Sequence, residues 1–176
     1  MDLRERSRAL KESLDHRILV LDGAMGTMIQ QRQLRAEDFG GAALEGCNEH
    51  LVLTRPDVIL DIHREYLAAG SDVIETDTFG GAALVLAEYG LSDRASLINR
   101  RAAELARQAA DEASTASRPR FVAGAMGPTT KAITVTGGVT FPDLERDFHE
   151  QAKALIEGGC DLLLIETCQD TRNVKA

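Results

Sequence analysis

LVLDGAMGTM, residues 19–28, is the stretch of sequence that decides the fold. Its three apolar residues at 19–21 lack a polar face, which is typical of a strand in a parallel sheet that is covered on both sides. Asp22 follows directly, and an ionised side chain inside such a sheet costs free energy unless it is paired. We therefore expect Asp22 at the exit of the strand. A lone Asp-Gly pair is also an ordinary turn signal, in which the aspartate bonds only its own backbone.

Three further segments repeat this pattern. FVAGAMGPT at 121–129 is again an apolar run that contains Gly-Ala-Met-Gly, and the segments SDVIETDTF at 71–79 and CDLLLIETCQDT at 160–171 both reach Ile-Glu-Thr. Helical patterns separate the four segments, as a parallel sheet requires, because parallel neighbours are joined only by long crossovers. The sequence thus predicts four parallel strands whose exits alternate between Gly-Ala-Met-Gly and Glu-Thr.

The clearest helix is predicted over Thr54–Ala69. Thr54 and Asp57 form a capping pair, Pro56 lies in the first turn, and Gly70 ends the helix. Further helices are expected from Ser92, from Thr140 to Gly158 with Asp143 in the cap, over 82–89, and as an amphipathic leader over 3–14 that caps the fold. Residues 30–53 and 129–139 are expected to be the least regular parts, on the face where α/β proteins build their sites.

Composition excludes several classes of protein. No apolar run approaches the roughly 20 residues that a membrane helix needs, and the charged N-terminus lacks the apolar core of a secretory signal, so we expect a cytoplasmic protein without a membrane span. A net charge of −8, with no basic stripe, argues against a nucleic-acid partner. The loop at 23–27 lacks the lysine of a P-loop, which argues against a nucleotide site.

The cysteines and histidines predict no metal centre. Cys47, Cys160 and Cys168 are too few and too scattered for a disulfide framework, and their spacing is not that of a zinc ribbon. The four histidines have no HExxH spacing, so we assign none of them a role as a ligand.

Four strands that alternate with helices and deliver polar residues at their ends predict an α/β fold, about the first four units of a (β/α)8 TIM barrel. Such a barrel normally takes about 250 residues, so the chain holds half of one. The alternative is an open, doubly wound sheet, which would place its crevice at a switch point of the strand order.

The strand-end motifs, in their order and spacing, resemble those of the homocysteine S-methyltransferase family. They are DGAMGTM at 22–28, IETDTF at 74–79, GAMGPT at 124–129 and LIET at 164–167. The resemblance spans residues 16–176, with residues 1–15 as a leader helix. MGTMIQ at 25–30 is similar to the cobalamin-dependent branch, the homocysteine-binding module of methionine synthases.

This resemblance implies a methyltransferase reaction. Homocysteine would bind in the barrel mouth, zinc would hold its thiol as a thiolate, and the methyl group would come from methylcobalamin, recharged by methyltetrahydrofolate on cobalamin- and folate-binding modules elsewhere in the enzyme. Betaine- or S-methylmethionine-dependent homocysteine methyltransferases share the motifs and are the alternative. A non-catalytic amino-acid-binding protein, or a half-barrel that pairs with a separate half, is the second alternative.

The resemblance also implies which residues contact the substrate. Asp22 and Glu166 match the acidic residues that pair the homocysteine ammonium group, and the backbone N–H groups of Gly23 and Ala24 would bind its carboxylate. Glu75 and Thr76, with Thr78, would line the same mouth; the equal alternative is that these three only position the loops.

The zinc ligands of the family are three cysteines, one after the sixth strand and an adjacent pair near the last. None of the three cysteines of this chain matches them, so we expect the ligands beyond residue 176. We expect the chain to be the truncated N-terminal part of a longer enzyme, and to be inactive in methyl transfer by itself.

Overall fold

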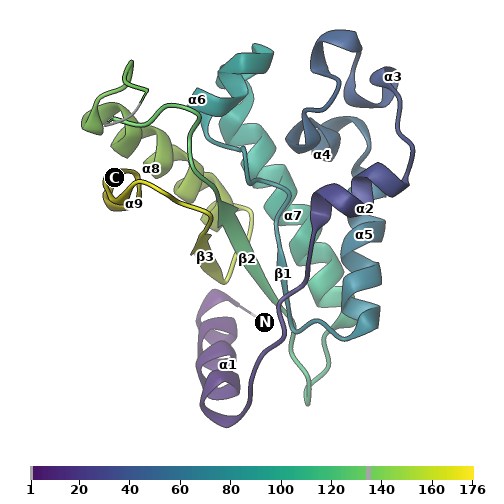
Figure 1. The fold of residues 1–176 in the computed structure, drawn as a ribbon. Helices are drawn as coiled ribbons and strands as arrows, with labels where there is room; N and C mark the ends of the chain where they lie inside the picture. Colours follow the sequence, from purple (N-terminus) through teal and green to yellow (C-terminus); the bar gives the residue numbers. More distant parts are fainter. Residues whose placement is uncertain (1, 134–135) are drawn as a thin grey trace.

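The computed structural model describes residues 2–133 and 136–176, which contain one parallel three-stranded sheet (Figure 1). Its strands are β1 (Val73–Glu75), β2 (Phe121–Met126) and β3 (Leu162–Ile165), in the order β1-β2-β3. The register pairs Glu75 with Ala123, and Met126 with Ile165. The predicted parallel α/β sheet is confirmed, with strands shorter than the predicted segments.

The first predicted strand is reduced to an edge contact. Leu21 forms an isolated parallel bridge with Val73, and the N–H groups of Asp72 and Val73 donate to the carbonyl of Val20 at 2.7 and 3.1 Å. The prediction that this segment is covered on both sides is wrong, since Val20 and Leu21 are 55% and 41% exposed. The segment lies at the edge of the sheet, where no described strand covers its outer side.

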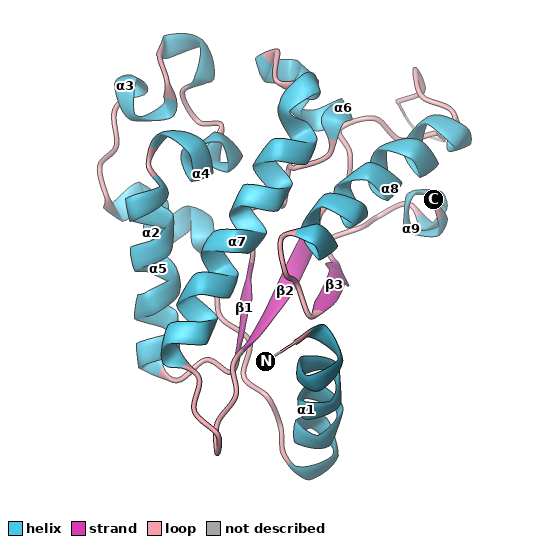
Figure 2. Ribbon diagram, turned by 180° about the vertical axis from the view of Figure 1, so that it is seen from behind, coloured by secondary structure: helices cyan, strands magenta, loops and turns pink. Residues whose placement is uncertain are grey.

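Three long helices, α5 (Pro56–Ala69), α7 (Ala95–Ala113) and α8 (Phe141–Glu157), cover one face of the sheet (Figure 2). Their apolar stripes meet the buried side of the strands, where Ile74 and Val122 are fully buried. At the end of α8 the packing is close, because a Cβ atom on Gly158 would lie 2.5 Å from the Cβ of Ala103 in α7. None of the described helices is long and apolar enough to cross a membrane.

Two of the predicted helix ends are confirmed. Gly70 follows α5 in the left-handed region, with φ 117°, which only glycine adopts without cost. Before α8, Thr140 and Asp143 form a capping box, in which the Asp143 carboxylate accepts the N–H of Thr140 at 3.0 Å. Each interaction satisfies a backbone group that the helix itself leaves without a partner.

The predicted capping pair of Thr54 and Asp57 is wrong. The Thr54 hydroxyl donates backwards to the carbonyl of His50 at 3.3 Å, because Thr54 ends a short preceding helix, α4 (Leu51–Thr54). Asp57 accepts two hydrogen bonds from the Arg55 guanidinium, at 3.0 and 2.8 Å. Pro56 does lie in the first turn of α5, as predicted.

Most of the region predicted as irregular between 30 and 53 folds into short helical turns that enclose a second core around Phe39 and Leu51. The predicted helix at 82–89 is present. Ser92 opens a 3-10 turn directly before α7 begins. Of the predicted loop at 129–139, residues 134 and 135 lie outside the described residues. The short elements are α2 (Met25–Gln31), α3 (Ala36–Phe39), η1 (Ala42–Leu44), η2 (Asn48–His50), α4, α6 (Ala83–Leu86), η3 (Ala87–Tyr89), η4 (Ser92–Arg94) and α9 (Thr171–Lys175).

The leader folds as helix α1 (Leu3–His16) and lies below the amino ends of the strands (Figure 1). Its Ala9 and Leu10 pack against the small apolar cluster on the second face of the sheet. Arg6 in α1 forms an ion pair with Asp161, directly before β3, at 2.6 Å. The helix therefore closes the end of the sheet that is opposite to the strand exits.

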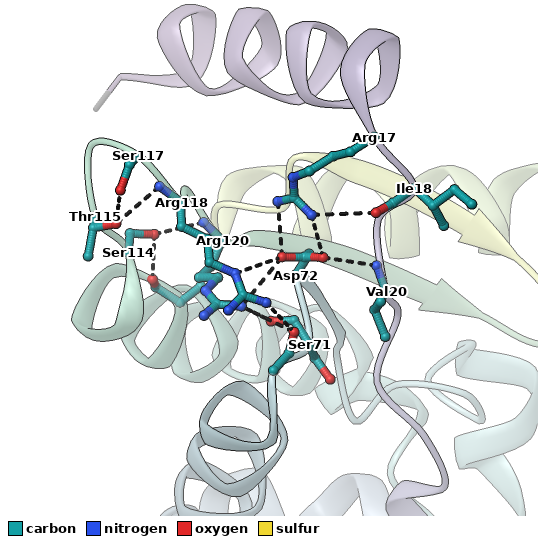
Figure 3. Close-up of polar contacts among 12 residues, drawn as sticks. Arg17, Ile18, Val20, Ser71, Asp72, Ser114, Thr115, Ser117, Arg118 and Arg120 are labelled. Atoms are coloured by element: carbon teal, nitrogen blue, oxygen red, sulfur yellow. Dashed lines mark hydrogen bonds and ion pairs between the residues drawn. The ribbon is translucent and has the colours of Figure 1, made fainter.

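Asp72, directly before β1, is the second attachment point at this end of the sheet. Arg17, after α1, donates to both of its carboxylate oxygens at 2.7 and 3.0 Å, and Arg118 and Arg120 lie 3.2 and 3.5 Å away (Figure 3). Burial by itself would raise the pKa of Asp72, but the bonds from Arg17, the Val20 N–H and Arg118 outweigh it and hold this pKa at about 2. The carboxylate is ionised at all physiological pH values.

Candidate substrate site

A cavity of about 340 Å³ opens at the carboxyl ends of the strands, opposite to α1. Three of the predicted site residues, Asp22, Glu75 and Glu166, come from three different strand exits and meet there. No lysine, arginine or histidine lines the cavity within the described residues. The lining residues are Asp22, Gly23, Ala24, Met25, Gly26, Glu75, Thr76, Asp77, Phe79, Ala125 and Glu166.

Asp22 is held in place by β1. Both of its carboxylate oxygens accept the backbone N–H of Glu75, each at 3.1 Å, so the aspartate bonds across the strands and not only within its own turn. Burial raises the pKa of the Asp22 carboxyl to about 7, against the opposing effect of this hydrogen bond, and the charges of Glu75 and Glu166 add to the rise. Asp22 therefore titrates near neutral pH.

Glu75 and Glu166 form a carboxyl pair across the cavity. Burial, together with the nearby Glu166 carboxyl, raises the pKa of Glu75 to about 7. The residue after Glu166, Thr167, has φ 54°, a left-handed conformation that is costly for a β-branched side chain. The chain therefore turns at Thr167, directly after Glu166 of the carboxyl pair.

Thr76 reaches the cavity, but its hydroxyl is already used. The N–H of Ala125 in β2 donates to Thr76 Oγ1 at 3.0 Å, Thr76 and Thr78 hydroxyls lie 2.6 Å apart, and Thr78 Oγ1 donates to the Ala125 carbonyl at 2.7 Å. Because the Thr78 proton points to the carbonyl, Thr76 must donate to Thr78. The two threonines thus fasten the exit of β1 to β2.

The turn at Gly23 and Ala24 is packed against Tyr66 of α5. The Tyr66 hydroxyl donates to the carbonyl of Ala24 at 3.4 Å, and a Cβ atom on Gly23 would lie 3.3 Å from that hydroxyl oxygen. Within the described part of the chain, no backbone acceptor takes the N–H of Gly23 or of Ala24. Both groups remain available at the wall of the cavity.

Asp77 is a residue of the cavity that we did not predict. It is buried, its Oδ2 has no hydrogen-bond partner among the described residues, and burial, together with the charge of Glu49, raises its pKa well above the usual value. Glu49 in turn accepts the N–H of Gly80 at 2.8 Å. The signal was present in the sequence, because Asp77 lies two residues after Glu75 and strand side chains alternate with a period of two.

The three cysteines do not form a zinc site. Cys47 and Cys160 are buried, and burial raises the pKa of their thiols to about 11 and about 12. Cys168 is near the cavity, where its thiol donates to the carbonyl of Glu166 at 3.2 Å. Among residues 2–133 and 136–176 no three His, Cys, Asp or Glu side chains are placed so that they could hold a metal ion, whereas a protein zinc site needs at least three ligands.

Comparison with known proteins gives the family. The model of the homocysteine S-methyltransferase family matches residues 19–176. The chain belongs to this family. It is 44% identical over 167 residues to a methionine synthase of Mycobacterium leprae, a match that covers 95% of this chain and 14% of that protein. The chain thus spans only a small part of this relative.

Solved structures show the same fold. The homocysteine methyltransferase MmuM of Escherichia coli matches in an oxidized form, with a TM-score of 0.75 and 24% identity, over 97% of this chain and 59% of that chain. Its metallated form matches with a TM-score of 0.75 and 23% identity, over 97% and 60% of the two chains. The resemblance read from the four motifs is confirmed at the level of the family.

Proposed function

We propose that the cavity binds the amino-acid end of L-homocysteine, and that the chain is the substrate-binding part of an enzyme that methylates homocysteine to methionine. One observation carries the proposal: three carboxyl groups from three strand exits share a cavity that has no basic side chain among its described lining residues. An ammonium group that leaves water needs a counter-charge and hydrogen-bond acceptors. Asp22 and Glu166 supply both.

The opposite end of the amino acid fits the turn beside Asp22. The N–H groups of Gly23 and Ala24 donate to the substrate carboxylate in this proposal, since exposed backbone amides bind anions. Glu75 completes the acidic wall of the cavity. Thr76 contributes to the shape of the cavity wall and not a hydrogen bond to the substrate, because its hydroxyl is bonded to Thr78 and Ala125.

The wider fold that we propose is the first half of a (β/α)8 barrel. Its support is the parallel order of the strands, with α5, α7 and α8 on one face and the carboxyl cluster at the strand exits. In such barrels the active site lies at that end. The likeness to MmuM, which extends over 97% of this chain, agrees with this arrangement.

Zinc and the methyl donor belong to the proposal for the complete enzyme. The described side chains do not fit zinc, so we assign its ligands to cysteines outside residues 1–176. Methylcobalamin, recharged by methyltetrahydrofolate on other modules, is the proposed donor, and the 44% identity to a methionine synthase favours it. Betaine or S-methylmethionine as donor, and amino-acid binding without catalysis, are the alternatives.

Calorimetric titration of the chain with L-homocysteine tests the binding site. Asp22→Asn and Glu166→Gln should each weaken binding by about 10- to 100-fold, the worth of a hydrogen bond to a charged group, and N-acetyl-homocysteine, which lacks the ammonium group, should bind as weakly. Glu157→Gln, on the exposed end of α8, is the matched control. Unchanged affinity in both site variants would refute the proposal, and stoichiometric zinc in the purified chain would refute the assignment of its ligands.

A further inference from the structure

Glu75 and Glu166 line the same cavity, and the nearby Glu166 carboxyl contributes to the raised pKa of Glu75. A carboxylate only accepts hydrogen bonds, so two carboxyl groups bond to each other only when one of them is protonated. A shared proton therefore allows the Glu75 and Glu166 carboxyl groups to lie close together in this cavity.

Among the described residues that line the cavity, no basic side chain is present to compensate a second negative charge on the pair. The titratable groups that face it are Asp22 from the edge segment, Tyr66 from α5, Asp77 after β1 and Cys168 after Glu166, all of them acidic or neutral. Arginine is present at the other end of the sheet, around Asp72, but does not line this cavity. A second negative charge in the cluster would face the first one without a counter-ion.

We propose that Glu75 is a specificity-determining residue that shares a proton with Glu166, and that the ammonium group of the amino acid displaces this proton when it binds. The inference rests on the proposed function and deepens it. In the exchange the protonated pair and the ammonium ion become an ionised pair with the ammonium ion bound, and one proton leaves to the solvent. No bond within the substrate changes.

The positions of the groups explain why a proton and an ammonium ion compete. The N–H of Glu75 donates to the Asp22 carboxylate, which holds these two acids side by side, and Glu166, directly after β3, lines the same cavity. An entering cation stabilises the ionised form of all three carboxyls. The pKa values of Asp22 and Glu75, both about 7, place the exchange where small changes of pH alter binding.

The exchange favours cationic ligands over isosteric neutral ones. A neutral analogue gains no charge interaction and leaves the proton in place, whereas an ammonium group gains two or three carboxylate contacts at once. Binding of the cation should therefore strengthen as pH rises through about 7, by about tenfold between pH 6 and pH 8 for one proton released. Below pH 6 the protonated form of the pair predominates, and the ammonium group binds weakly.

Calorimetry with L-methionine tests the exchange, because this ligand has the ammonium group but no thiol proton. Titrations at pH 7 in phosphate and in Tris, which differ in ionisation enthalpy, should show release of about half to one proton for each ligand bound. Glu75→Gln keeps a donor to Glu166 but holds no exchangeable proton, so the release should fall by at least half. Glu157→Gln should release as many protons as the wild type.

An infrared measurement on the wild type gives a readout without any variant. The C=O stretch of a protonated carboxylic acid should be present at pH 7 and should weaken when L-methionine is added. Binding without proton release, in equal strength at pH 6 and pH 8, would overturn this inference and leave the proposed site intact. Absence of any binding of L-homocysteine and L-methionine would instead overturn the proposed function itself.

Discussion

His63 gives a prediction for the stability of the whole chain. The residue lies on α5 and is 0% exposed, and neither ring nitrogen has a hydrogen-bond partner among the described residues. Burial lowers the pKa of this imidazole to about 4, from 6.5 in the unfolded chain. Between these two values the unfolded chain binds a proton that the folded chain does not, so the free energy of unfolding falls as pH falls.

The size of the effect follows from the shift. One pKa unit is worth about 1.4 kcal/mol, so the full shift corresponds to about 3 kcal/mol, of which about 2 kcal/mol is lost between pH 7 and pH 5. The substitution His63→Leu removes this term. Urea denaturation at both pH values should therefore show that the wild type loses about 2 kcal/mol more than the variant.

A matched control is His16→Gln at the exposed end of α1, because this variant also removes a histidine but takes no ring out of the core. Equal losses of stability in the wild type and in His63→Leu between pH 7 and pH 5 would refute the reasoning. In that case the buried ring would have to be protonated in the folded chain, with a partner that accepts from it.

Three further predictions concern packing and ion pairs. Asp72→Asn should lower the free energy of unfolding by about 3 kcal/mol at pH 7, because it leaves the buried Arg120 without its anion; urea denaturation measures this, and exposed Asp93→Asn is the control. Gly158→Ala should cost about 1 to 3 kcal/mol by overpacking against Ala103, whereas Gly26→Ala in α2 should gain up to about 1 kcal/mol; equal melting temperatures would contradict both. Thr78→Val should cost about 1 to 3 kcal/mol because it leaves the Ala125 carbonyl without a donor and the Thr76 hydroxyl proton without an acceptor, while Thr78→Ser, which keeps the hydroxyl, should cost less in the same urea titration.

Sequence patterns predicted the features that depend on periodicity. The parallel order of the strands, the helix end at Gly70 and the capping box at Thr140 each follow from local chemistry that tertiary contacts did not override. Asp22, Glu75 and Glu166 could be brought together from the sequence alone, because the carboxyl ends of parallel strands meet at one edge of a sheet.

Features that depend on distant contacts could not be predicted. Thr54 has the sequence of a cap but bonds to His50, because another short helix ends there. The exposure of Val20 depends on which strands are its neighbours, and the apolar run looks the same at an edge as in the middle of a sheet. The burial of His63 and Asp77 without partners is likewise set by the elements packed against them.

The ion pairs of α1 have a consequence for the order of events during synthesis. Arg6 and Arg17 leave the ribosome among the first residues, but their partners Asp161 and Asp72 follow 155 and 55 residues later. The leader can therefore make one attachment once β1 has been made, and the second only after β3 has been made. Its docking is completed late, because the ion pair of Arg6 forms only after Asp161 has been made.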